Sequence, residues 1–174
     1  MYSKERIPRI VVTGPPCAGK STTVALLQKE LAVTAQCVPE VASLLIIQLG
    51  IQPGTPGERI VLEPGFQHTL YHMQNLFENV SERIAMHTQK RFLVCDKGTL
   101  DIAAHVSGGI AGYEKLFGTT QKDDYAQYDM VLFLELPPKR IYDMLCKTNP
   151  ARRENFEQAK ELEEKVRQVW RNHR

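Results

Sequence analysis

Residues 9–22, RIVVTGPPCAGKST, carry the strongest structural signal in this chain. The run from Ile10 to Val12 is apolar without alternation, which is typical of a parallel strand covered on both faces. The segment from Gly14 to Gly19 is too rich in glycine and proline to be helical, and an amphipathic helix should follow from Lys20 to about Ala32. The stretch therefore predicts a strand, a tight turn and a helix in direct succession.

The turn matches the pattern GxxxxGK[ST] completely, between Gly14 and Ser21. Backbone N–H groups of such a loop wrap around phosphates, and the helix N-terminus adds partial positive charge. In this pattern the lysine reaches the terminal phosphates and the hydroxyl ligates magnesium. We therefore predict a site for ATP or GTP with Mg²⁺, with Lys20 facing solvent until the nucleotide binds. Its residues are Gly14, Pro15, Pro16, Cys17, Ala18, Gly19, Lys20, Ser21 and Thr22.

A second metal ligand is expected at Asp96, which ends the apolar strand of RFLVCDKG. A carboxylate at this place can hold magnesium directly or through water, together with Ser21. The alternative is a helix N-cap or a solvated turn residue. We favour the metal role because a triphosphate site of this kind needs a metal partner.

The rest of the chain continues the alternation of strands and helices. Further strands are expected at 35–38, 92–95 and 130–134, and helices at 41–49, 66–89, 99–106, 139–147 and 154–171. This pattern predicts an α/β protein of the P-loop NTPase fold, with a parallel sheet of four to five strands and helices on both faces. We expect one domain over residues 1–174. No fifth strand can follow the last helix in this sequence, so we favour a longer natural chain over a four-stranded sheet.

The helix at 66–89 shows an apolar stripe, which predicts its core-facing side. The stripe consists of Phe66, Leu70, Met73, Phe77, Val80 and Ile84. On the same helix His68 and His72 are four residues apart, a spacing that can bind metal. Without an HExxH motif we interpret both histidines as exposed polar residues.

Composition narrows the class of protein. The net charge of +2 gives no reason to expect nucleic acid or a membrane surface as partner. No window is long and apolar enough to span a bilayer, and the N-terminus lacks an apolar leader segment. The four widely spaced cysteines form no CxxC pair, so we expect reduced thiols and a cytoplasmic location. The oligomeric state stays open.

Several short motifs together resemble a known family over residues 9–171. They are VVTGPPCAGKST, VPEVA, VCDKGTLDIAAHV and NPARRE, with a glutamine, Gln74, on the long helix. The pattern is similar to the AAA-domain family that includes the ribosylnicotinamide kinase domain of bacterial NAD-biosynthesis regulators and the TRPL translocation defect protein. More distantly it resembles deoxynucleoside and thymidylate kinases.

The resemblance implies an acceptor side to the site. Glu40 matches an acid that faces the acceptor and serves as base or hydroxyl ligand. Lys97 takes the place of an arginine that touches phosphate, although lysine lacks the planar bidentate fork. The family often has arginine where this chain has Ser43, which weakens the usual substrate contact. For Glu40 the alternative is an acid suited to a helix N-terminus, and for Lys97 a simple ion pair.

Four other residues receive roles from the resemblance alone. Gln74 would read a base edge of the acceptor, and Asp101 recurs in the family after the DRG-like element. Arg152 and Arg153 match a lid, at about 148–156, whose arginines close on the phosphates. The alternatives are a solvated Gln74, a local cap or pair for Asp101, and ordinary solvated arginines.

These residues favour a small-molecule kinase that transfers the γ-phosphoryl group of ATP or GTP to a nucleoside-like or other hydroxyl acceptor. Its predicted catalytic residues are Lys20, Glu40, Asp96, Arg152 and Arg153. The alternatives are a nucleotide-dependent switch with slow or no transfer, and an ATPase that acts on a protein partner. A G-protein is disfavoured, because the segment from Gln121 to Asp124 lacks the asparagine of the guanine-reading motif.

Overall fold

A four-stranded parallel sheet forms the centre of the protein, in a computed structural model that describes residues 6–51, 59–61, 63–147 and 154–173. Its strand order is β2-β3-β1-β4. The strands are β1 (Arg9–Thr13), β2 (Ala35–Val38), β3 (Phe92–Asp96) and β4 (Met130–Phe133). Val12 lies opposite Asp96 and Leu132, so the carboxyl ends of the three neighbouring strands meet at one edge. The predicted parallel sheet is confirmed.

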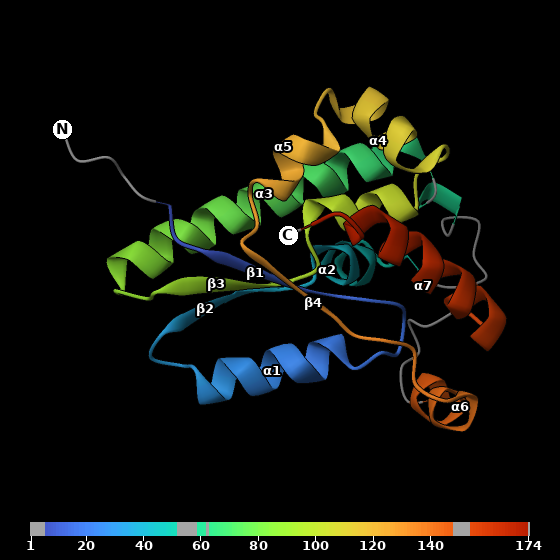
Figure 1. The fold of residues 1–174 in the computed structure, drawn as a ribbon, viewed down its shortest axis with the longest axis horizontal. Coiled ribbons are helices and arrows are strands. Elements are labelled where there is room, and N and C mark those ends of the chain that lie inside the picture. The colour runs from blue at the N-terminus through green and yellow to red at the C-terminus, as the bar shows by residue number, and fades with distance from the viewer. Residues whose placement is uncertain (1–5, 52–58, 62, 148–153, 174) are drawn as a thin grey trace.

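Helices cover both faces of this sheet, as the sequence predicts (Figure 1). On one face lies α1 (Lys20–Glu30), and on the other lie α3 (Pro64–His87), α4 (Gly109–Phe117) and α5 (Gln121–Tyr125). The connections carry α2 (Val41–Gln48) after β2, the 3₁₀ helix η2 (Thr99–Ala104) after β3, and α6 (Lys139–Lys147) after β4. The last helix, α7 (Phe156–Trp170), packs against η2.

Strand residues contribute to two separate hydrophobic cores, because successive side chains point to opposite faces of a sheet. Val11 belongs to the larger cluster, on the side of α3 and α7, together with Leu93 and Trp170. Its neighbour Val12 belongs to the smaller cluster, where it meets Val24 of α1. Burial on both faces explains why these strands read as continuous apolar runs.

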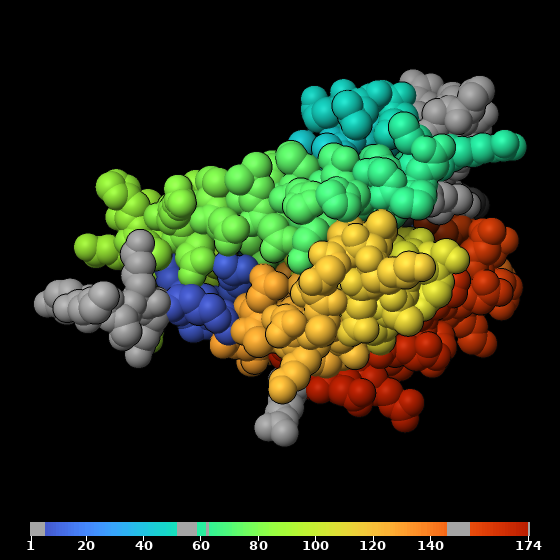
Figure 2. All heavy atoms as spheres, turned by 90° about the horizontal axis from the view of Figure 1, so that it is seen from above, coloured from blue at the N-terminus to red at the C-terminus, as the bar shows by residue number. Residues whose placement is uncertain are grey.

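The orientation of α3 differs from the prediction. The expected apolar stripe is buried only at its start, since Val80 and Ile84 are 45% and 44% exposed on the outer side of the helix. The face toward the sheet instead carries polar residues, among them Gln74 and Glu78, which are 4% and 0% exposed. Figure 2 shows the outer side of α3, in green, exposed on the surface of the molecule. The apolar stripe did not predict which side of α3 faces the sheet, because buried polar contacts fix the second half of the helix.

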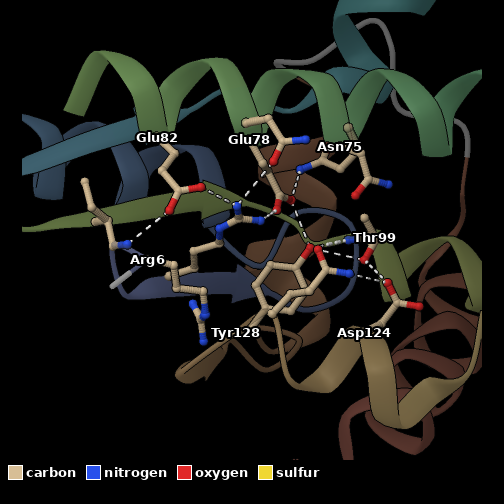
Figure 3. A network of polar contacts seen from close by, with 12 residues as sticks. Arg6, Asn75, Glu78, Glu82, Thr99, Asp124 and Tyr128 are labelled. Carbon is tan, nitrogen blue, oxygen red and sulfur yellow. Dashed lines mark hydrogen bonds and ion pairs between the residues drawn. The ribbon is translucent and has the colours of Figure 1, made fainter. Parts of the chain in front are cut away.

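Those partners form a buried network beneath α3 (Figure 3). Oε2 of Glu78 accepts a hydrogen bond from Arg9 Nη1 at 2.9 Å, and Oε1 accepts from Gln74 at 2.8 Å and from the Tyr128 hydroxyl at 2.9 Å. The Thr99 hydroxyl lies 3.1 Å from that of Tyr128 and links the network to α5. Burial raises the pKa of Glu78, against the opposing effects of Gln74 and Arg9. The network ties α3 to β1 and to η2 by polar contacts that hydropathy does not reveal.

Two further elements differ from the sequence prediction. Gly108, at φ 83°, caps the start of α4, a helix that was not among those expected from the sequence. The helix expected over residues 99–106 is a shorter 3₁₀ helix, η2, which ends at Ala104. Within the described residues no strand follows α7, so the part of the sheet that the structure describes has four strands.

Candidate functional site

The loop after β1 adopts backbone angles that glycine allows. Gly14 has φ 136°, and a Cβ atom at this position would lie 2.1 Å from the carbonyl oxygen of Leu134. Gly19, at φ 85°, caps α1, and Cys17 also lies in the left-handed region at φ 58°. The loop therefore curls tightly at the N-terminus of α1, where backbone N–H groups and the helix dipole favour an anion.

Lys20 is buried in this structure, so the prediction that it faces solvent is wrong. Its side chain is 4% exposed, and Nζ donates a hydrogen bond to the Pro15 carbonyl oxygen at 2.6 Å. The loop folds over the ammonium group because a buried charge needs polar partners. A phosphate that binds here must take over contacts that the loop now makes.

Ser21 and Asp96 meet at the carboxyl edge of the sheet and fit a metal ion. Both residues line the same cavity, and the Ser21 side chain is close enough to lower the pKa of the Asp96 carboxylate. Oδ1 of Asp96 is buried and has no hydrogen-bond partner among the described residues. Burial and then the charge of Glu40 raise the pKa of Asp96, while Lys20 and Lys97 oppose this rise. An unpartnered carboxylate oxygen beside a hydroxyl is a donor set that suits Mg²⁺.

Glu40 lies at the end of β2, where it is the N-cap residue of α2. Its Oε1 forms an ion pair with Lys97 Nζ at 2.7 Å, and its Oε2 accepts a hydrogen bond from the Ser43 hydroxyl at 2.6 Å. Lys97 occupies the left-handed region at φ 69°, which is uncommon for a residue with a side chain. The two residues that depart from the family pattern, Lys97 and Ser43, thus both hold Glu40.

A cavity of about 490 Å³ opens between α1, β2 and α2. Its polar lining brings together Ser21, Gln28, Glu40, Ser43 and Asp96. The apolar part of the lining is contributed by Val24, Ala25, Cys37, Val38, Pro39 and Ile47. The hollow therefore joins the predicted metal ligands to the predicted acceptor acid, at the edge of a parallel sheet where ligands usually bind.

Gln74 and Asp101 hold the loop that follows β3. Gln74 donates to the carbonyl oxygen of Lys97 at 3.3 Å as well as to Glu78, so it is not solvated. Asp101, which is 4% exposed, accepts hydrogen bonds from the Gly98 backbone N–H at 2.8 Å and from the Thr13 hydroxyl. Neither residue lines the cavity described above. Their substrate contacts stay predictions.

Gly98 lies behind Lys97 in a close fit. A Cβ atom here would lie 3.0 Å from the Tyr128 ring and 3.2 Å from the ring of Trp170.

The predicted lid residues Arg152 and Arg153 lie outside the described residues. The structure therefore brings together Ser21, Asp96, Glu40 and Lys97. Sequence reasoning missed the role of Ser43 as a partner of Glu40, although its spacing of three residues on α2 gives a signal.

Comparison with known proteins places this chain in a family. A family model described as an AAA domain matches residues 9–174. The chain belongs to this AAA-domain family. A comparison of this chain with curated proteins finds no match by sequence.

One solved structure shows that the fold of the AAA domain is shared. It is the crystal structure of the NadR protein in complex with NAD and AMP-PNP, with a TM-score of 0.64 and 16% sequence identity. The match covers 95% of the present chain and 41% of the NadR chain, so the AAA domain spans less than half of that protein. The predicted family resemblance and the P-loop α/β fold are thereby confirmed. Among residues 6–51, 59–61, 63–147 and 154–173, no helix has the length and apolar character needed to cross a bilayer.

Proposed function

We propose that this AAA domain is a cytoplasmic small-molecule kinase, which transfers the γ-phosphoryl group of ATP or GTP to a hydroxyl of a nucleoside-like acceptor. One observation carries the proposal: Ser21, Asp96 and Glu40 face a single cavity beside the phosphate-binding loop. A kinase must hold the donor phosphate and the acceptor hydroxyl in line, and this arrangement places a hollow with an acid next to the donor site. The bound AMP-PNP of NadR, which shares the fold, supports ATP as donor.

Each predicted site residue would have a separate role in phosphoryl transfer. Lys20 would exchange the Pro15 carbonyl oxygen for phosphate oxygens. Ser21 and Asp96 would hold Mg²⁺, which supplies charge neutralisation at the transferring phosphoryl group. Glu40 would accept a hydrogen bond from the acceptor hydroxyl and take its proton. Arg152 and Arg153 would close on the phosphates from the lid. Lys97 and Ser43 hold the two oxygens of Glu40 in place, and an acceptor hydroxyl can bind beside them because each carboxylate oxygen can accept more than one hydrogen bond.

The test is the variant Glu40→Gln in an acceptor-dependent turnover assay. Loss of a general base should lower transfer by roughly a hundredfold or more. Donor affinity, measured by titration calorimetry with ATP and Mg²⁺, should change little, since Glu40 lies on the acceptor side. The matched control is Glu63→Gln, at an exposed acid just before α3. Equal rates in Glu40→Gln and the control would contradict the role of Glu40.

A second candidate is a nucleotide-dependent switch with slow or no transfer. It is favoured by the state of Glu40, whose two oxygens are both engaged by Lys97 and Ser43. If no nucleoside or related hydroxyl compound stimulates turnover of the intact chain, the kinase proposal fails and the switch takes its place.

A further inference from the structure

Two histidines on the outer side of α3 converge on one point. His68 and His72 lie one helical turn apart, and both side chains are exposed. Their Nε2 atoms are 3.3 Å apart, and their ring centroids are separated by 4.3 Å. The two Nε2 atoms are thus close enough to share one hydrogen bond or to bind one ion.

The separation of the two nitrogens matches the bite of a tetrahedral metal ion. Two Zn–N bonds of about 2.0–2.1 Å at the tetrahedral angle place the nitrogens about 3.3–3.4 Å apart. The observed distance of 3.3 Å equals this separation, so an ion can bridge the two nitrogens after a small rotation of the rings. Imidazole nitrogen is also the side-chain ligand that divalent zinc, copper and nickel share.

The rings are held in this arrangement by neighbouring aromatic side chains. His68 lies 6.0 Å from the ring of Phe117 in α4, and His72 lies 5.6 Å from that of Tyr71. Tyr71 and Phe117 stack on each other with centroids 4.4 Å apart. Restricting the two imidazoles before binding lowers the entropy cost of holding a ligand.

We propose that His68 and His72 form a binding site for a divalent transition-metal ion of the Zn²⁺ type, separate from the magnesium site. Both nitrogens must then be unprotonated, with the ring proton on Nδ1. In the absence of metal, one Nε2–H can instead donate to the other Nε2, so metal binding replaces this hydrogen bond. The shift of one proton from Nε2 to Nδ1 balances the exchange without net proton release.

No third protein ligand is needed for this proposal. No group of three or more metal-binding side chains occurs in the part of the chain that the structure describes. Water molecules would fill the other positions on the ion, as they do where a metal keeps open coordination sites. The bound ion would cross-link the turn of α3 that lies just before Gln74, the residue that holds the Lys97 carbonyl.

The experiment is calorimetric titration of the full chain with ZnCl₂, in buffer that already contains saturating Mg²⁺. The variants are His68→Gln and His72→Gln. The matched control is His87→Gln, which removes an exposed histidine of the same helix that has no histidine one turn away. Since thiolates also bind zinc, the comparison between variants decides the question and the total binding does not.

We expect the unmodified chain and His87→Gln to bind Zn²⁺ at this site equally well. Each site variant should weaken that binding by roughly tenfold or more, since even outer-shell changes cost that much. The zinc-induced rise in Tm should shrink in the same two variants and persist in the control. Absence of zinc binding in the unmodified chain, or binding unchanged in both site variants, would overturn the proposal. Nucleotide binding is not part of this readout, so the result is independent of the kinase test.

Discussion

Replacing Glu78 by Gln should destabilise the protein strongly, because this residue is the hub of the buried network under α3. Glu78 is 0% exposed, with one oxygen paired to Arg9 and the other accepting from Gln74 and Tyr128. A glutamine has only one side-chain oxygen that can accept these hydrogen bonds. Its NH₂ group must therefore face either Arg9 or the pair of Gln74 and Tyr128, all of which donate to Glu78. Arg9 keeps a second partner in Glu82, at 2.9 Å.

The magnitude follows from the loss of one member of a buried charge pair. Such a change costs about 3–5 kcal/mol, and the remaining pair with Glu82 places Glu78→Gln near the lower end. For a chain of this size, about 3 kcal/mol lowers Tm by about 6–12 °C. The assay is thermal unfolding followed by circular dichroism.

The matched control is Glu82→Gln, at the other partner of Arg9, whose side chain is 17% exposed. Water can replace part of the lost interaction there, so we expect a cost of about 1 kcal/mol. The double variant Arg9→Met, Glu78→Leu should be more stable than Glu78→Gln, because apolar side chains of similar size need no partner. A fall in Tm for Glu78→Gln no larger than for Glu82→Gln would refute the reasoning.

Three further predictions concern the phosphate and metal sites. Gly14→Ala should abolish ATP binding and destabilise the fold by at least about 1–3 kcal/mol. The control Gly65→Ala, at a helical position of α3 with open space around it, should stabilise the fold by about 0.5–1 kcal/mol in the same unfolding assay. Asp96→Asn should weaken Mg²⁺-dependent ATP binding by roughly tenfold or more and metal-free binding little; calorimetry showing intact magnesium dependence would contradict this. Since burial and Glu40 raise the pKa of Asp96, and Mg²⁺ needs the carboxylate, magnesium affinity should fall with decreasing pH already above the ordinary aspartate range of about 3.9. The Asp96→Asn variant should lose this pH dependence.

Much of the fold could be predicted because local signals and tertiary packing agree. The apolar strands and the Gly/Pro turn before Lys20 correctly predicted the sheet and the tight loop at the start of α1. The α3 stripe failed in its second half, where Val80 and Ile84 point outward while Glu78 points to Arg9. That inversion depends on a partner 69 residues away in the chain, which periodicity within one helix cannot reveal.

The candidate site was predictable as a set of residues but not as a set of contacts. Asp96 and Glu40 each end a parallel strand, so the sequence could place them at one edge. The pairing of Glu40 with Lys97 depends on the left-handed backbone at Lys97, for which a lysine gives no local signal. The burial of Lys20 likewise depends on how the loop closes over its own lysine, which a motif does not describe.

The close fit of Gly98 against Trp170 gives this protein a natural optical probe. Trp170 is the only tryptophan in the sequence, and its ring lies against the backbone that carries Lys97 into the site. We expect a movement of the backbone at Lys97 and Gly98 to change the surroundings of the indole and so its emission. If a ligand in the cavity moves this stretch of backbone, its binding can be followed in unlabelled protein by fluorescence, in real time and without a chemical reaction.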